Sequence, residues 1–141
     1  MYNEILVPTD GSEGSEVALE HAIEIAQKFD ARVHALYIID IRARTTGDMW
    51  ASLVGQFREI GENATESIAD RIKDQGLDAV REVTEGIPHK GVNNYVDEND
   101  IDLVVMGTQG RTGLDRVLVG STTEKVIRTS EVPVMTVRKE D

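Results

Sequence analysis

Short apolar runs alternate along this chain with segments in which apolar residues recur every three or four positions. The runs indicate strands and the recurrent segments indicate helices, because a buried strand is apolar throughout whereas a helix buries one stripe. Strands are expected at residues 4–9, 32–40, 79–84, 101–106 and 132–137, and helices at about 13–29, 49–75, 88–96 and 121–129. This alternation predicts a single α/β domain over residues 1–141, with a doubly wound five-stranded parallel sheet sandwiched by helices, Rossmann-like, in strand order 3-2-1-4-5.

The two longest predicted helices each carry an apolar stripe. In the first, Ala18, Ala22, Ile25 and Phe29 recur at spacings of four, three and four. The second has its apolar residues on one face at Leu53, Phe57, Ile60, Ala64, Ile68 and Ile72. The polar stretch 41–48 before this helix is expected to be an exposed loop.

Ligands of doubly wound sheets bind at the carboxyl ends of the strands, where the strand order changes direction. Asp10 follows the first predicted strand, and Gly107 follows the fourth. If these two strands are neighbours, the residues that follow them face one another.

Composition excludes several classes of function. The chain has no cysteine, which rules out disulfides, thiol catalysis, thiolate metal sites and iron–sulfur clusters. Its net charge of −11, from 26 acidic and 15 basic residues, argues against nucleic acids and anionic membranes as partners. No apolar run approaches the roughly 20 residues of a spanning helix, and the first residues lack the basic region of a signal peptide. The protein is therefore expected to be soluble and cytoplasmic.

The acidic excess leaves two interpretations open. Many carboxylates with few lysines are typical of a protein from a salt-loving host, whose ions screen the repulsion between like charges. An acidic protein of an ordinary mesophile has the same balance. Stability that does not rise with added salt would remove the halophilic interpretation.

The most specific pattern lies near the C-terminus, where Gly107 and Gly110 are followed after nine residues by Gly120 and Ser121. An apolar run ends at Met106 and a predicted helix begins at Ser121, so these glycines stand in a loop from a strand to a helix. Glycine lets backbone N–H groups approach an anion, and the helix start offers unpaired donors and the positive end of its dipole. The loop therefore predicts a phosphate-binding site.

Other residues define this loop further. It is neither a P-loop nor a Gly-x-Gly-x-x-Gly dinucleotide site, because the spacing and the Gly-Lys-Ser/Thr ending are missing. Arg111 and Arg116 bring local positive charge to an acidic chain. We expect Arg111 to steer or clamp a polyphosphate, and Arg116 to serve solubility or a salt bridge. Ser121 is expected to be the N-cap of the last helix, in a capping box with Glu124.

Two other chemistries fail on the residues present. A receiver-type phospho-acceptor needs an Asp at the end of the third strand and a Lys near the fifth, but the third strand ends in Glu85-Gly86 and no Lys begins the fifth. The histidines, His21, His34 and His89, have no metal-ligand spacing and form no catalytic triad with Ser and Asp.

The chain resembles the universal stress protein family over essentially its whole length. Residues 5–12 are similar to the first strand and turn of the family, and residues 132–137 to its last strand. The spacing Gly107-x2-Gly110-x9-Gly120-Ser121 matches the ATP-binding pattern of the family in full. Some branches of this family lack the glycine pattern and do not bind ATP. This chain resembles the branch that does.

The resemblance implies a set of contacts to ATP. Pro8, Thr9 and Asp10 would lie against the nucleotide, and the backbone near Ile38 and Asp40 would receive adenine and ribose. Further contacts to the ribose and the phosphates would come from Met106, Gly107, Gly110, Gly120, Ser121 and Thr122. A carboxylate such as Asp10 would repel a triphosphate unless Mg²⁺ or a ribose hydroxyl intervened.

The resemblance also implies a homodimer that forms through the last strand, Val132 to Val137. On an unpaired edge, Val134 and Thr136 would suit antiparallel pairing about a two-fold axis.

We therefore expect an ATP-binding stress-response protein that acts as a nucleotide-dependent signalling or protective module. Hydrolysis is expected to be slow at most, because the sequence supplies no efficient catalytic base or arginine finger in a defined geometry. Three alternatives stay open: a Mg²⁺-dependent ATP hydrolase or adenylyl-transferring enzyme, a sensor of AMP or cyclic AMP, and an interaction module that binds no nucleotide.

Overall fold

The structure is a computed structural model that describes residues 1–11, 13–44, 47–108 and 120–138. Its elements in chain order are β1 (Glu4–Pro8), α1 (Glu13–Phe29), β2 (Arg32–Asp40), the 3₁₀ helix η1 (Ile41–Ala43), α2 (Asp48–Asp74), β3 (Ala79–Gly86), α3 (Pro88–Glu98), β4 (Leu103–Gly107), α4 (Ser121–Thr129) and β5 (Val134–Val137). The predicted alternation of strands and helices is confirmed. The last strand begins two residues later than expected, because Val132 is held in a turn by hydrogen bonds with Ser130 Oγ.

All five strands are parallel and lie in the order β3-β2-β1-β4-β5, which confirms the predicted order. The chain first adds β2 and β3 on one side of β1, and then returns to add β4 and β5 on the other side. The strand order therefore changes direction between β1 and β4, where Leu6 is in register with Val104.

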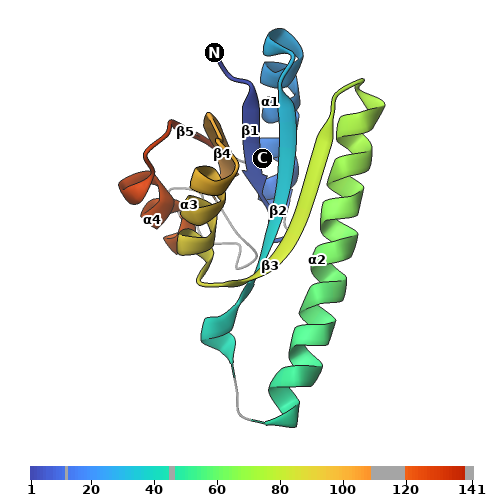
Figure 1. Ribbon diagram of the computed structural model, residues 1–141, viewed down its shortest axis with the longest axis vertical. Helices are drawn as coiled ribbons and strands as arrows, with labels where there is room; N and C mark the ends of the chain where they lie inside the picture. Colours follow the sequence, from blue (N-terminus) through green and yellow to red (C-terminus); the bar gives the residue numbers. More distant parts are fainter. Residues whose placement is uncertain (12, 45–46, 109–119, 139–141) are drawn as a thin grey trace.

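Helices cover both faces of the sheet, with α1 and α2 on one side and α3 and α4 on the other (Figure 1). Alternate residues of β1 serve the two layers. Ile5 and Val7 pack with α1 and α2, whereas Leu6 packs with α3 and α4. All three are fully buried, and burying a side chain of this size contributes about 1.5–3 kcal/mol. Burial on both faces explains why the strand is apolar throughout.

The buried stripe of α1 differs in part from the predicted one. Ala18 and Ala22 are fully buried as expected, but Phe29 is 43% exposed at the helix end, where its ring meets the ring of Tyr2 edge-on. The stripe is completed by Leu19, Ile23 and Ala26. Small alanine side chains let the middle of α1 lie close to the sheet, so the stripe is centred on them.

The buried residues of α2 lie in its second half, and its first turns extend past the sheet (Figure 1). The closest approach is at Gly61, where an added Cβ would lie 2.6 Å from the ring of Tyr37. The predicted core positions Ile68 and Ile72 are confirmed, whereas Ile60 is exposed. Ile60 precedes the buried Gly61 by one residue, so it lies to one side of the helix face that meets the sheet.

Candidate functional site

The carboxyl ends of β1 and β4 lie side by side, at the point where the strand order changes direction. Pro8 ends β1 and is followed by Thr9 and Asp10, while Met106 and Gly107 end β4. The two segments singled out from the sequence therefore meet at one edge of the sheet, as predicted. This edge is where doubly wound folds bind their ligands.

Hydrogen bonds of its own polar groups hold the turn after β1. Thr9 N donates to Leu36 O of β2 (2.8 Å), and Thr9 Oγ1 accepts from Gly11 N (3.0 Å). Gly11 has a φ of 84°, a left-handed conformation that favours glycine. Ser15 Oγ, in the first turn of α1, donates to Asp10 Oδ1 (3.3 Å). The Asp10 carboxylate is thus held at the start of α1, where the helix dipole favours negative charge.

Gly107 is the residue at which β4 comes closest to α1. An added Cβ would lie 2.7 Å from both the carbonyl carbon and the carbonyl oxygen of Gly14. Backbone atoms cannot turn aside as the end of a flexible side chain can, so a glycine is needed here. The packing of β4 against α1 is therefore enough to explain why residue 107 is a glycine, without any role in ligand binding.

Thr108 and Gly120, which we call the loop base, join the two ends of the segment 109–119. Gly120 N donates to Thr108 O (2.8 Å), and Thr108 N donates to Val137 O of β5 (3.0 Å). Thr123 Oγ1 adds a hydrogen bond to Gly107 O (3.1 Å). Helix α4 therefore begins directly beside the end of β4.

Three residues of the predicted loop, Gly110, Arg111 and Arg116, lie outside the described residues. Their roles stay predictions. The described parts of the glycine pattern are its first residue and its last two, and the loop base brings these together.

The N-terminus of α4 is not capped by a side chain of the described residues. The predicted capping box is wrong, because Gly120 is the N-cap and Ser121 already belongs to the helix. Gly120 O accepts the first helical hydrogen bond from Glu124 N (2.9 Å), and the Glu124 side chain pairs with Arg128. Ser121 is exposed and Thr122 is half-buried. The first backbone N–H groups of a helix have no acceptor within it, so they are the donors that an anion could use.

The end of β2 lies next to the end of β1. Asp40 caps η1 and accepts hydrogen bonds from Arg42 N (2.9 Å) and Arg42 Nη2 (2.7 Å). Hydrogen bonds from the Arg42 side chain outweigh the effect of burial and hold the pKa of Asp40 below its ordinary value. Ile38 is half-buried against the start of α3, where a Cβ on Gly91 would lie 2.6 Å from Ile38 Cδ1. The segment 41–48, predicted to be a loop, therefore includes a capped 3₁₀ turn.

Basic side chains gather around the start of α3, at the same edge of the sheet. Burial lowers the pKa of His89, and the charges of Lys125, Lys90 and Arg42 lower it further. These three residues belong to α4, α3 and η1. Lys90 and Lys125 thus bring positive charge to this edge, whereas the charge of Arg42 is paired with the Asp40 carboxylate.

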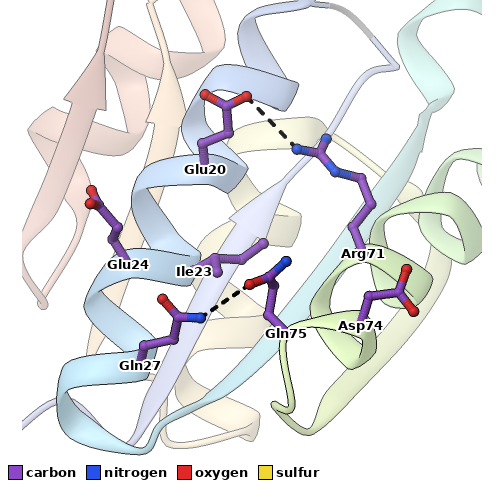
Figure 2. Close-up of a pocket in the computed structure, with 7 residues that line it drawn as sticks. All are labelled: Glu20, Ile23, Glu24, Gln27, Arg71, Asp74 and Gln75. Carbon is purple, nitrogen blue, oxygen red and sulfur yellow. Dashed lines mark hydrogen bonds and ion pairs between the residues drawn. The ribbon is translucent and has the colours of Figure 1, made fainter.

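A separate hollow of about 310 Å³ lies between α1 and α2 (Figure 2). It is lined by Glu20, Ile23, Glu24, Gln27, Arg71, Asp74 and Gln75. Gln27 Nε2 donates to Gln75 Oε1 (3.3 Å), and Arg71 lies 3.9 Å from Glu20. The lining residues of α1 lie in the half of the helix that leads into the start of β2, so the hollow lies toward the amino ends of the strands. It contains none of the predicted site residues.

Sequence reasoning missed one polar residue at the carboxyl edge, Thr108. Its hydroxyl oxygen is buried and has no hydrogen-bond partner among the described residues. The available signal was its position between Gly107 and Gly110 in the glycine pattern. Whether a hydroxyl there is paired depends on tertiary contacts, which spacing does not show.

Within the described residues, no three His, Asp or Glu side chains are grouped so that they could hold a metal ion. The described helices also include none that is long and apolar enough to cross a membrane. The candidate site is therefore one of backbone donors, hydroxyls and the Asp10 carboxylate.

Known proteins resemble this chain over nearly its whole length. A sequence profile of the universal stress protein family matches residues 1–138. Universal stress protein MJ0531 of Methanocaldococcus jannaschii is 36% identical over 142 residues, which cover 99% of this chain and 84% of that protein. The solved structure of MJ0577, from the same organism, superimposes with a TM-score of 0.91 at 32% identity and covers 100% of this chain and 99% of that one. A universal stress protein solved in complex with cAMP shares the fold, with a TM-score of 0.77 at 24% identity and 99% of each chain covered.

Proposed function

The chain belongs to the universal stress protein family, and from this premise we propose that it binds ATP at the carboxyl edge of its sheet. One observation carries the proposal. Helix α4 begins without a side-chain cap from the described residues, beside the switch point between β1 and β4. An uncapped helix start at a switch point supplies donors for phosphate where doubly wound folds bind nucleotides.

The phosphates would be held at the start of α4. The backbone N–H groups and hydroxyls of Ser121 and Thr122 are the donors, and Gly120 leaves room for phosphate to approach them. Among the described residues, an added Cβ on Gly120 would meet only Thr108 O at 3.6 Å, so these residues leave room beside Gly120. Gly110 of the glycine pattern would bind the same phosphates through its backbone, and the charge of Arg111 would steer or clamp them.

The nucleoside would lie across the ends of β1, β2 and β4. Ile38 offers an apolar side chain to adenine, and the backbone near Asp40 offers polar groups to adenine and ribose. Asp10, with Pro8 and Thr9 before it, accepts from a ribose hydroxyl. Met106 and Gly107 line the side of β4.

Mg²⁺ fits this site only as a partner of the phosphates. The described residues form no three-ligand metal cluster, so Asp10 would contribute a carboxylate oxygen and the nucleotide the other charged oxygens. When bound, the ion would neutralise the repulsion between the carboxylate and the triphosphate.

Binding rather than turnover is the activity that we propose, with hydrolysis slow at most. The Asp10 carboxylate already accepts a hydrogen bond from Ser15 Oγ, so one of its oxygens is engaged within the fold. Occupancy by ATP would then act as a signal by favouring one conformation of the segments 41–48 and 107–120. This makes the protein a nucleotide-dependent module of a cytoplasmic stress response.

We also propose that two copies pair through the last strand, within Val132 to Val137. β5 is an edge strand of the sheet, and its Met135 and Thr136 are exposed. An exposed edge strand can pair with its copy about a two-fold axis. Light scattering after size exclusion should give twice the mass of 15.6 kDa.

The test of nucleotide binding combines extraction and titration. Mass spectrometry of the denatured protein identifies any nucleotide that co-purifies, and calorimetry then measures Kd for ATP, AMP and cAMP with Mg²⁺. We expect ATP to bind in the micromolar range, about −8 kcal/mol.

Gly120→Val is the variant that separates binding from folding. The φ of Gly120 is −59° and its surroundings are open, so a side chain there is compatible with the fold but fills the approach to α4. Gly55→Val is the matched control, because Gly55 lies in the projecting half of α2 and the described residues place no atom within 4 Å of its added Cβ. ATP affinity should be lost in the first variant and kept in the second. Tighter binding of AMP or cAMP by the unmodified protein would contradict the choice of ATP.

A further inference from the structure

The Thr108 hydroxyl is an exception among the buried threonine hydroxyls that the structure describes. Thr65 Oγ1 donates to Gly61 O (2.8 Å), Thr123 Oγ1 donates to Gly107 O, and Thr9 Oγ1 accepts from Gly11 N. Thr108 Oγ1 is buried and has no such partner in the described part of the chain. A buried hydroxyl without a partner lowers stability, so its presence calls for an explanation.

The backbone of Thr108 is held on both sides. Its N–H donates to Val137 O (3.0 Å), and its carbonyl oxygen accepts from Gly120 N (2.8 Å). These two bonds tie the Thr108 backbone to β5 and to Gly120, so it cannot move away without breaking them. The backbone of Thr108 is therefore fixed beside the start of α4, while its hydroxyl has no hydrogen bond to the described residues.

Strand geometry assigns the Thr108 side chain to the α4 side of the sheet. Val104 and Met106 pack in the layer that contains Val126 of α4, whereas an added Cβ on Gly107 would point at Gly14 of α1. The hydrogen bond from Thr108 N to Val137 O continues the ladder between β4 and β5 by one residue. Because side chains of a strand alternate between its faces, Thr108 follows Met106 toward α4.

We propose that the Thr108 hydroxyl donates a hydrogen bond to a phosphate oxygen of the bound nucleotide. The inference rests on the proposed function, and it adds a binding residue beside the uncapped start of α4. A hydroxyl donates well to an anionic oxygen, and such charge-assisted bonds are stronger than neutral ones. Binding then gives the buried oxygen the partner that it lacks.

Thr108→Val is the decisive variant because it moves stability and affinity in opposite directions. Valine keeps the shape of threonine and removes the unpaired oxygen, so urea unfolding should show unchanged or higher stability. The affinity for ATP should fall roughly 10- to 100-fold, the effect of losing one hydrogen bond to a charged group. Thr108→Ser keeps the hydroxyl and should keep most of the affinity.

Thr65→Val is the matched control, because Thr65 is fully buried and its hydroxyl is paired within the fold. This variant should lose stability and keep the affinity for ATP. Calorimetry on all variants is run with ATP in excess Mg²⁺ and again in EDTA. A bond to phosphate predicts the same fold-change in both conditions.

Each result that differs from these expectations overturns a specific claim. Equal affinity of the unmodified protein and Thr108→Val overturns the inference alone and leaves nucleotide binding in place. A loss of affinity seen only with Mg²⁺ overturns the phosphate bond in favour of a metal contact. A loss of stability in Thr108→Val overturns it by showing that the hydroxyl has a partner within the fold. If the unmodified protein binds neither ATP, AMP nor cAMP, the proposed function and this inference fail together.

Discussion

Polar groups are paired with one another at the amino end of the sheet, whereas some at the carboxyl end have no partner among the described residues. At the amino end, Glu4 Oε1 accepts from His34 Nε2 (2.6 Å) and from Arg32 Nε (2.9 Å), and His34 Nδ1 lies 2.7 Å from the Tyr95 hydroxyl. At the carboxyl end, the Thr108 hydroxyl lacks a partner among the described residues, and α4 begins without a side-chain cap from them. Paired polar groups stabilise a fold, whereas unpaired donors gain from a ligand.

The amino-end network shows that residue types alone do not make a site. Histidine, glutamate and tyrosine are common catalytic residues, but here their polar groups form hydrogen bonds with one another. A carboxylate only accepts, so His34 Nε2 donates to Glu4, and in the neutral imidazole Nδ1 then accepts from the Tyr95 hydroxyl. With His34 only 2% exposed, the network joins β1, β2 and α3 and needs no ligand.

The largest effect on stability is expected from His34→Ala. The change leaves a cavity and removes the partner of the buried Tyr95 hydroxyl, so the free energy of unfolding should fall by about 2–4 kcal/mol. Nucleotide affinity should stay unchanged, since the network lies at the far end of the sheet. Urea denaturation and ATP titration measure the two quantities, with His21→Ala on the exposed face of α1 as control. A loss of affinity without a loss of stability would reverse the contrast between the two ends.

Gly107→Ala tests the one place where fold and site coincide at the carboxyl end. The added methyl group would meet the Gly14 backbone at 2.7 Å, which should cost about 1–3 kcal/mol of stability. The start of α1 would shift, and with it Asp10, so ATP binding should weaken as well. Gly55→Ala is the control, because its methyl group meets nothing within 4 Å and a helix prefers alanine. A fully stable Gly107→Ala protein would contradict the packing argument.

The fold was predictable because its pattern is local. The run Leu103 to Met106 is buried on both faces, and such a run separates a parallel strand from a helix without knowledge of its neighbours. The extent of helix burial was not predictable. Phe29 and Ile60 continue their stripes in the sequence but are exposed, because Phe29 is the last residue of α1 and Ile60 lies to one side of the face of α2 that buries Gly61.

The site was predictable in its location but not in its details. The glycine spacing correctly predicted that a strand ends near Gly107 and that a helix begins at Ser121. It did not reveal that Gly107 is required by the Gly14 backbone, which is distant in the sequence. Nor could it decide between Gly120 and Ser121 as the N-cap, because a one-residue difference in the helix start depends on tertiary hydrogen bonds such as that from Thr123 to Gly107.

A smaller effect is expected from Tyr95→Phe, which leaves the buried His34 Nδ1 without a donor and should cost about 1–2 kcal/mol. Burial, followed by the charge of Glu82, raises the pKa of Tyr95 to about 12. The unfolded phenol ionises near 10, so stability should fall as pH rises from about 10 to 12. Ultraviolet absorbance should show one phenol that ionises late, and the variant should lack it. A titration that the substitution leaves unaltered would contradict this environment for Tyr95.

The smallest effect concerns the acid side of the same network. Burial raises the pKa of Glu4, but hydrogen bonds from Arg32 and His34 outweigh it and hold the value below the ordinary 4.5. A carboxyl group whose pKa is lowered by folding stabilises the fold at pH values above its ordinary pKa. This contribution is lost as pH falls through 4.5 toward the pKa of Glu4 in the folded protein. Because Arg32 is half-exposed and solvent screens the pair, the contribution should be about 1 kcal/mol or less.

Glu4→Gln isolates this contribution by comparison of unfolding free energies at several pH values. The difference from the unmodified protein should be largest near pH 7 and should shrink progressively as pH falls through 4.5 and the Glu4 carboxylate becomes protonated. Glu131→Gln, at an exposed position outside the network, should show no such change in the difference. Two Glu4 curves that stay parallel down to pH 3 would mean that the amino end does not favour the charged carboxylate. In that case the amino-end network would stabilise the fold by packing and not by the charge of Glu4. The contrast with the carboxyl end would then consist only in the unpaired hydrogen-bond donors found there.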